Sequence, residues 1–166
     1  MMCLHWHEWR CSLEQRIEVL ELAIVREHKA NAVSRRLATI PGIGPITATA
    51  IAATIADPAV FKSGREFAAW IGLVPRQHSS GGKQKLGRIS KQGDQYLRRL
   101  LTVGATAVMR RVSGKLDRLS VWVRELLGRR PFRLVSLALA NKLARIAWAV
   151  MTKQEAYRSS PTAAAA

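Results

Sequence analysis

Acidic side chains are scarce in this sequence. Its 166 residues include 11 Asp and Glu against 27 Lys and Arg, which gives a net charge of +16. Many nucleic-acid enzymes hold two metal ions with clustered carboxylates. Here the acids that follow the first predicted helix are scattered: Asp57, Glu66, Asp94, Asp117, Glu125 and Glu155. We therefore assign no metal site and no cofactor to this chain, and we do not expect it to be a metal-dependent nuclease on its own.

Uninterrupted apolar runs are also lacking. The most apolar stretch, residues 134–151, contains Asn141, Lys142 and Arg145, whereas a membrane-spanning helix needs about 20 predominantly apolar residues. No apolar signal segment opens the chain, and two cysteines in a basic sequence do not indicate a disulfide framework. We expect no membrane contact and a location in the cytoplasm. The surplus of positive charge indicates nucleic acid as the partner.

The apolar pattern predicts a mainly α-helical fold, since no long alternating run requires a sheet. Ser12 and Gln15 form a capping-box pattern that opens a coiled-coil-like helix over residues 12–37. Its apolar seam consists of Leu13, Ile17, Leu20 and Ile24. Such a seam either packs on the protein's own core or pairs with another copy, and we favour pairing. Residues 38–153 are predicted to form one compact helical domain, and residues 154–166 a disordered tail.

Residues 1–11 match no pattern of this fold and are left unassigned. They contain four potential zinc ligands, Cys3, His5, His7 and Cys11. The spacing of these ligands matches none of the usual paired metal-binding motifs. We therefore favour a loose terminal segment over a metal site there.

The segment Pro41–Gly44 predicts a tight turn in front of a helix. Glycine permits positive φ and lets phosphate oxygens approach the backbone N–H groups at the start of the next helix. The Pro-Gly-Ile-Gly spacing resembles the hairpin of a helix-hairpin-helix module, which binds the nucleic-acid backbone. Gly42 and Gly44 are therefore candidate contacts, and a plain turn between two helices is the alternative.

The most informative segment is Pro75–Leu101, in which two hydroxyls and two glycines stand among many cations and a single acid, Asp94. Asp94 is well placed to cap the helix that follows it. The predicted nucleic-acid contacts of this segment are Gly81, Gly82, Lys83, Lys85, Arg88, Lys91, Arg98 and Arg99. A hydroxyl of Ser79 or Ser80 can attack a phosphodiester and retain it as a phosphoserine, while the cations stabilise the developing charge. From the residues alone, a flexible connector is the more common role of such a loop.

The run from Ile40 to Arg111 resembles the C-terminal domain of a bacterial insertion-sequence transposase family, the one-ten family with its one-sixteen and nine-oh-two relatives. The resemblance covers about Ser34 to Met151. It depends on the pairing of PGIG with W-x-G-L-V-P-R-Q-H-S-S-G-G-K, and the ending ALANKLARIAWAVM resembles the family's last helix.

This resemblance implies a recombinase that is guided by an element-encoded RNA. In the family, a ribonuclease-H-like domain with acidic residues and magnesium works with a helical domain that carries a catalytic serine. That serine would be Ser79 or Ser80, and Ser79 is favoured because relatives often carry Ser or Thr at the second position. DNA and guide RNA would be the partners.

The acidic domain of that family, on which magnesium is expected, is absent from this sequence. We therefore expect a C-terminal transposase fragment that is inactive alone. For activity it would need an intact partner. Through its N-terminal helix it would pair with another copy or with a full-length transposase. A non-enzymatic binding module of the helix-hairpin-helix type and the remnant of a decayed element are the alternatives.

Overall fold

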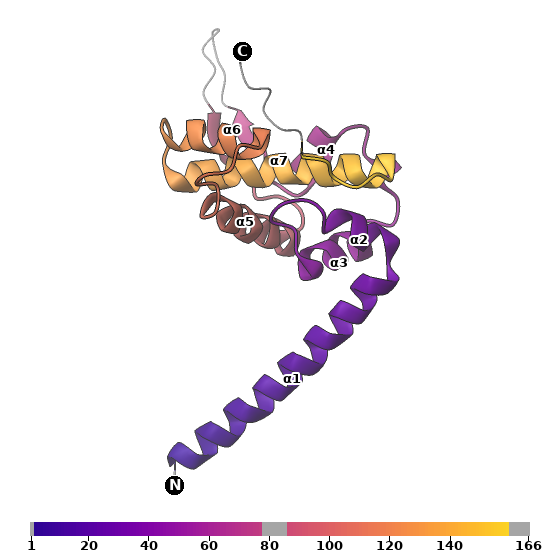
Figure 1. Cartoon of the computed structure of the whole chain (residues 1–166), viewed down its shortest axis with the longest axis vertical. Coiled ribbons are helices and arrows are strands. Elements are labelled where there is room, and N and C mark those ends of the chain that lie inside the picture. Colours follow the sequence, from indigo (N-terminus) through magenta and orange to yellow (C-terminus); the bar gives the residue numbers. More distant parts are fainter. Residues whose placement is uncertain (1, 78–85, 160–166) are drawn as a thin grey trace.

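The computed structural model describes residues 2–77 and 86–159 (Figure 1). This part of the chain forms seven α-helices, one 3-10 helix and one pair of strands, so the prediction of a mainly helical fold is confirmed. The elements follow in the order α1 (Met2–Ala30), α2 (Ala32–Leu37), α3 (Pro45–Thr54), η1 (Pro58–Val60), α4 (Gly64–Trp70), β1 (Pro75–Gln77), β2 (Leu86–Ile89), α5 (Gln95–Met109), α6 (Arg118–Leu127) and α7 (Phe132–Lys153).

α1 extends away from the rest of the protein as a single rod (Figure 1). The predicted helix start at Ser12 is wrong, because the helix begins at Met2 and Ser12 lies exposed inside it. Residues 2–11 contain no glycine or proline that would end a helix, and an ion pair of 3.7 Å between Arg10 and Glu14 spans the predicted boundary. Residues 2–11 are therefore the first turns of α1. The side chains of three potential metal ligands lie outside the described part: Cys3, His5 and His7.

The helix predicted over residues 12–37 is interrupted at Asn31. The Asn31 side chain accepts hydrogen bonds from the backbone N–H groups of Val33 (2.9 Å) and Ser34 (3.0 Å), which caps α2 and separates it from α1. Ser34 is fully buried at this bend. Its Oγ lies 2.7 Å from His28 Nδ1 and 3.2 Å from Thr49 Oγ1. A polar joint thus connects α1, α2 and α3.

α7 is the centre of the domain and packs against α2, α4, α5 and α6, which surround it in Figure 1. One stripe of α7 is buried along almost its whole length, and it includes Val135, Leu139, Leu143, Ala147 and Val150. Burial of one large aliphatic side chain stabilises a fold by about 1.5–3 kcal/mol, so this stripe contributes a large share of the stability. Among the described helices, α7 alone is long and apolar enough to cross a membrane, and half of that segment is buried inside the domain.

A short strand pair was not predicted. β1 and β2 run antiparallel, with Pro75 opposite Ile89 and Gln77 opposite Leu86, and the register is irregular between these positions. Strands of three and four residues are too short to show the alternation that identifies a strand in a sequence. The segment that joins them, residues 78–85, lies outside the described part, as do residues 160–166.

The first residues after α7 differ from the disordered tail that was predicted over residues 154–166. The chain leaves α7 at Gln154, which has a left-handed φ of 56°. The backbone N–H of Tyr157 then donates a hydrogen bond of 2.8 Å to Thr39 Oγ1, and the Tyr157 side chain packs against the core. Burial raises the pKa of the Tyr157 hydroxyl, and the negative charge of Asp117 adds to this effect. This segment therefore contacts the chain just before the turn at Pro41–Gly44.

The cap at Asn31 predicts a specific loss of stability. We expect Asn31→Ala to lower the free energy of unfolding by about 1 kcal/mol, because two backbone N–H groups at the start of α2 lose their acceptor. Asn31→Asp keeps an acceptor at the same place and should retain most of the stability. Urea unfolding followed by circular dichroism measures both variants. Equal stability of the two would contradict the capping role.

Candidate nucleic-acid interface

Two glycines hold the base of the strand pair against the helical core. Gly72, which follows α4, and Gly93, which precedes α5, have φ angles of +81° and +83°. A Cβ at Gly93 would overlap the carbonyl oxygen of Trp70, and a Cβ at Gly72 would overlap that of Gln92. Only glycine combines this backbone angle with such a close approach. The two segments that flank the predicted site therefore lie backbone against backbone.

Two backbone hydrogen bonds connect the same two segments between the glycines and the strands. The N–H of Ser90 donates to Val74 O (2.9 Å), and the N–H of Lys91 donates to Gly72 O (3.2 Å). Lys91 has a left-handed φ of 56°, at the point where the chain turns toward α5. Asp94 then accepts a hydrogen bond of 2.8 Å from Leu97 N, so its predicted role as the cap of α5 is confirmed.

The half-buried Arg98 connects these segments. Its Nη1 donates to Ile71 O at 2.8 Å and to Gln92 O at 3.3 Å. A nucleic-acid contact was the only role that the sequence predicted for Arg98, and that contact stays a prediction. Sequence analysis missed the two hydrogen bonds of Arg98 to these carbonyl groups, which we call the clamp. A pattern of side chains does not show which backbone carbonyl oxygens a distant turn presents.

Exposed cations surround the base of the strand pair, which we call the strand base. Three of these cations were predicted contacts: Arg88 on β2, Lys91 in the turn before α5, and Arg99 on α5. All three are exposed, as contacts with phosphate require. Sequence analysis missed a fourth exposed cation, Arg76 on β1, whose Nη2 lies 3.4 Å from Ser90 O. Within residues 2–77 and 86–159, no ion pair joins any of these four to a carboxylate. Their charge is therefore free to attract a polyanion.

The remaining predicted contacts of this segment lie outside the described residues. They are Ser79, Ser80, Gly81, Gly82, Lys83 and Lys85. In the sequence they stand between β1 and β2, where Gln77 and Leu86 are paired across the ladder. The chain thus enters and leaves this segment at one paired position, close to the exposed cations.

The turn at Pro41–Gly44 is fixed against the middle of α5. Gly42 has a φ of +85°, and a Cβ there would lie 2.7 Å from both Gly104 O and Val108 Cγ2. A Cβ at Gly104 would in turn overlap Gly42 O. The two backbones are therefore in direct contact, and both positions need glycine. Gly104 was not singled out from the sequence, where it is an isolated glycine inside a helical pattern.

Gly44 lies at the exposed end of the same turn. It is the N-cap of α3, with Pro45 as the first helical residue and no side chain that caps the helix. The N–H groups in the first turn of a helix have no partner within the helix, and they are well placed to bind an anion. Ile46 beside them is 43% exposed. The contacts predicted for Gly42 and Gly44 are compatible with this geometry and stay predictions.

α5 sets the spacing between the two predicted contact regions. Gly104 follows Gln95, the first residue of α5, by nine residues. At 1.5 Å per residue this is about 14 Å along the helix axis. Along the axis of B-DNA, one strand places about four phosphates over the same distance, since each phosphate advances by about 3.4 Å along that axis. One rigid helix therefore holds the turn and the strand base at a spacing that a single DNA segment can cover.

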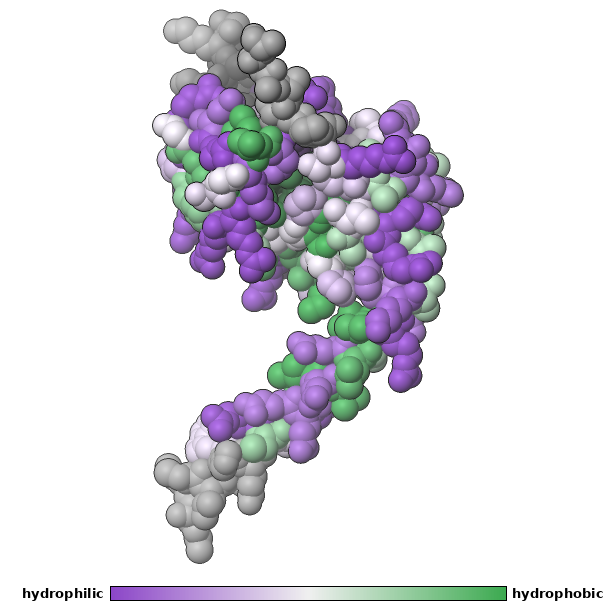
Figure 2. Space-filling view, viewed as in Figure 1, coloured by the Kyte–Doolittle hydropathy of each residue, from purple (hydrophilic) through white to green (hydrophobic). Residues whose placement is uncertain are grey.

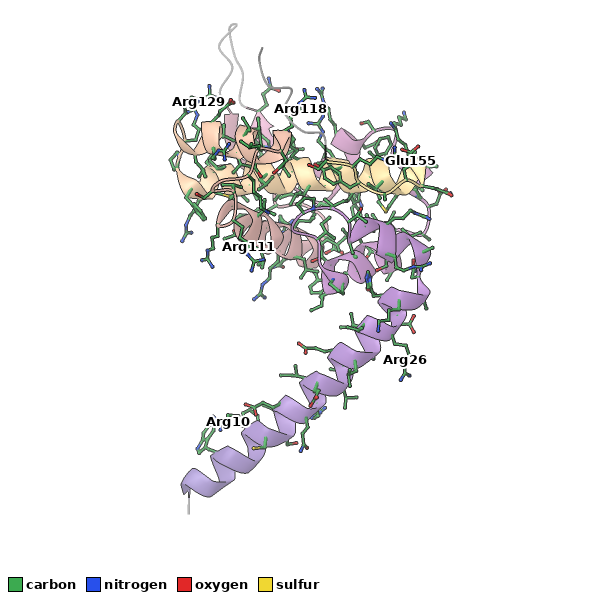
Figure 3. All side chains as sticks on the ribbon, viewed as in Figure 1. Arg10, Arg26, Arg111, Arg118, Arg129 and Glu155 are labelled. Atoms are coloured by element: carbon green, nitrogen blue, oxygen red, sulfur yellow. The ribbon has the colours of Figure 1, made fainter. Side chains whose placement is uncertain are left out.

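A cavity of about 360 Å³ borders the turn, and its lining includes Gly42, Arg111, Lys115 and Asp117. Figure 3 shows Arg111 on the α5 side of the domain, with Arg118 and Arg129 on the opposite, α6 side. Burial alone would raise the pKa of Asp117, but hydrogen bonds from Ser120 and the charge of Lys115 hold it below its ordinary value. Its carboxylate caps α6 through Ser120 N at 3.0 Å. The acid is thus used in the fold, and the two cations give the cavity a positive surface.

These features define a compact, basic helical domain of the kind that contacts nucleic-acid backbones. Residues 34–120 match the profile of the transposase IS116/IS110/IS902 family, and the chain belongs to this family. The resemblance found in the sequence is therefore confirmed.

Similar proteins include several transposases. The chain is 52% identical over 147 residues to a probable family 20 transposase of Pseudomonas aeruginosa, an alignment that covers 89% of this chain and 44% of the relative. It is 47% identical over 161 residues to a putative transposase of Sinorhizobium fredii, covering 96% and 41%. It is 48% identical over 130 residues to the transposase for insertion sequence element IS1111A of Coxiella burnetii, covering 78% and 36%. The chain thus spans less than half the length of each relative.

The contact between Gly42 and Gly104 predicts the sign of a substitution. Alanine inside a helix usually stabilises relative to glycine by about 0.5–1 kcal/mol, but here the added methyl would push the turn away from α5. We expect Gly104→Ala to destabilise the protein by roughly 1–3 kcal/mol, as overpacking does. Gly128→Ala is the control, because its Cβ would meet only ordinary contacts at 3.6 Å. Urea unfolding of both variants checks this, and a Gly104→Ala variant more stable than the parent would contradict it.

Proposed function

We propose that this chain acts in DNA transposition as the C-terminal, DNA-binding part of a transposase and carries its serine nucleophile. The observation that supports this most is the arrangement around α5. A glycine-built base surrounded by exposed cations stands at the start of the helix, and the Pro41–Gly44 turn contacts its middle. The segment with both serines begins and ends at that base. Its place of action would be the bacterial nucleoid, in the cytoplasm.

The chemical step that we propose is a transesterification. The Oγ of Ser79, or alternatively of Ser80, attacks a phosphorus atom of the DNA backbone. The new Oγ–P bond forms as one P–O bond to a deoxyribose breaks. The serine proton passes to a base, for which the adjacent His78 is a candidate, and the leaving sugar oxygen takes up a proton. The phosphodiester energy is thereby kept in the phosphoserine for the rejoining step.

Cations near the serines stabilise the extra charge of the phosphorane in this proposal. Arg88, Lys91 and Arg99 are exposed next to the strand base and can also hold the flanking phosphates. Lys83 and Lys85 belong to the same segment as the serines in the sequence. Together these groups would bind the DNA backbone without reading its bases, so target choice would come from another component, which we propose is the element-encoded guide RNA.

A metal-dependent step would need carboxylates from elsewhere. Among the side chains that the structure describes, which do not include those of Cys3, His5, His7 and Glu8, no three His, Cys, Asp or Glu lie close enough to hold a metal ion. The described donor set therefore does not fit magnesium, and no step of the proposal passes through a metal held by these residues. We propose that acidic residues and magnesium act from a separate transposase domain, supplied by a full-length partner.

A covalent adduct tests the serine directly. The chain is incubated with element-end DNA, guide RNA and a full-length family transposase, and adducts are separated under denaturing conditions. An adduct of the 18.4 kDa chain is distinguished from that of the longer partner by its size. We expect Ser79→Ala to abolish this adduct while DNA binding is unchanged, with Ser80→Ala as the matched control. An adduct that persists when both hydroxyls are replaced would rule out the nucleophile.

A non-enzymatic binding module is the second candidate, and the open first turn of α3 behind Gly44 favours it. Both functions require binding that weakens with salt, with a log–log slope of about −0.9 for each duplex phosphate neutralised. The binding module differs in that no adduct forms with any partner. Salt-dependent binding together with a complete absence of adduct would therefore favour this candidate.

We also infer that α1 pairs with another copy or with a full-length transposase. In Figure 2 green apolar residues alternate with purple ones along this rod. Ile17 and Leu20 of the predicted seam are 54% and 63% exposed, while Leu13 and Ile24 are partly covered. Contiguous exposed apolar surface of this kind marks a site of association. A coiled-coil contact would bury the seam and leave Glu14, Glu18 and Glu21 at its flanks.

A charge on the seam tests this association. We expect Leu20→Glu to abolish self-association in sedimentation velocity experiments, because the carboxylate would be buried opposite an apolar partner. Val60→Glu adds the same charge at a 72% exposed residue of η1 and should leave the association unchanged. A parent chain that stays monomeric at every concentration, with or without full-length transposase, would overturn the inference.

A further inference from the structure

A groove of about 660 Å³ lies on the domain between the start of α4, α6 and α7. We call it the cation–tryptophan groove and define it by Arg65, Trp122, Lys142, Arg145 and Trp148. Its volume is within the range of about 300–1,000 Å³ that small-molecule ligand sites occupy. None of these five residues was a predicted contact, and the groove is separate from the turn at Pro41–Gly44.

Close packing shapes the floor of the groove. Gly64 is buried at the start of α4, and a Cβ there would lie 3.1 Å from Arg145 O and 3.2 Å from Trp148 Cε3. The Trp148 indole N–H donates to Pro58 O at 3.2 Å, which fixes the ring. These contacts fix the floor of the groove.

The charge of the groove is positive and has no acidic counterpart. Lys142 Nζ lies 4.2 Å from the centroid of the Trp122 ring, a cation–π contact. Burial lowers the pKa of Lys142, and the charges of Arg118 and Arg145 lower it further. No carboxylate lines the groove. The nearest acid in sequence, Glu66, accepts a hydrogen bond of 2.7 Å from Lys62 N and is used in a cap. A bound anion would relieve the repulsion among these cations.

A hydrogen bond connects the lining of the groove to the chain just before the strand pair. Asn141 belongs to the lining, and its Nδ2 donates to Leu73 O at 3.2 Å, two residues before β1 begins. Indole rings beside cations suit a strand whose bases are unpaired, because a base can contact the exposed part of a ring while its phosphate contacts a cation.

We propose that the cation–tryptophan groove binds single-stranded nucleic acid, with Arg65, Lys142 and Arg145 on phosphates and Trp122 and Trp148 beside bases. An acidic peptide would satisfy the charges but would leave the aromatic faces without stacking partners. The inference goes beyond the proposed function, since it assigns a second binding surface for unpaired strands. It depends on that function only for nucleic acid as the natural ligand, and the serines play no part in it.

Charge reversal tests the groove. The full chain is titrated with a fluorescent RNA or DNA single strand of about 12 nucleotides, a length within the site sizes of single-strand-binding folds. We expect Arg65→Glu with Arg145→Glu to weaken binding by about tenfold or more. The matched control, Arg129→Glu with Arg130→Glu, changes the net charge by the same amount at exposed positions between α6 and α7. It should weaken binding by only about two- to threefold. Equal losses in both variants would overturn the inference.

Tryptophan fluorescence provides an independent measurement. The single strand should quench the emission of the parent chain, and Trp122→Phe should lose a large part of that quenching. Quenching that is the same in Trp122→Phe as in the parent would show that the strand binds elsewhere and would overturn the proposal. So would polyglutamate that competes as strongly as the oligonucleotide, since the ligand would then be an acidic polypeptide.

A third variant tests the proposed DNA interface independently of the groove. Arg88→Glu with Arg99→Glu changes the strand base and should weaken duplex DNA binding by about tenfold while single-strand binding falls far less. If this pair affects duplex binding no more than the control does, the proposed DNA interface fails and the groove stands on its own measurements. If the groove pair behaves like the control, the groove fails and the DNA interface is unaffected.

Discussion

Backbone contacts that only glycine permits fix the arrangement on which the rest of this structure depends. Gly93 against Trp70 and Gly72 against Gln92 fix the segments beside the start of α5, and Gly42 against Gly104 fixes its middle. At each contact a methyl group would meet a carbonyl oxygen, so the spacing between the elements is set by the main chain rather than by interchangeable side chains. The strand base and the Pro41–Gly44 turn have fixed positions relative to each other because both are held on α5.

The hydrophobic core holds this arrangement from the other side. α7 packs against both α5 and α4, so the stripe that stabilises the domain also positions the helices that carry the clamp. α1 is connected to the domain differently. It ends at the capped bend of Asn31, where the buried Ser34 hydroxyl contacts His28 and Thr49. The rod is thus anchored at one end by polar contacts, and most of its length extends away from the domain (Figure 1).

Local signals in the sequence predicted much of the fold. Asp94 as a cap, Pro41–Gly44 as a turn and the apolar stripe of α7 each depend on residues that are neighbours in the chain or on one helix face. The missed features depend on groups far apart in sequence. Arg98 binds the carbonyl of Ile71, and Gly104 meets Gly42, and neither partner can be identified from a local pattern. The start at Ser12 failed for another reason: a capping-box pattern does not begin a helix when the preceding residues are already helical. Of the site, the exposed Arg88, Lys91 and Arg99 were predicted, while Arg76 and the groove were not.

Helix capping also explains why so much positive charge is left uncompensated. Four of the six acids beyond α1 accept hydrogen bonds from backbone N–H groups: Asp57 from Ala59 (2.8 Å), Glu66 from Lys62 (2.7 Å), Asp94 from Leu97 (2.8 Å) and Asp117 from Ser120 (3.0 Å). A carboxylate held at a helix start is stabilised there by the helix dipole. Among the described residues, none of these four carboxylates forms an ion pair with a cation of the strand base or of the groove. The cations at the strand base and in the groove therefore stay available for the polyanion that we propose as their ligand.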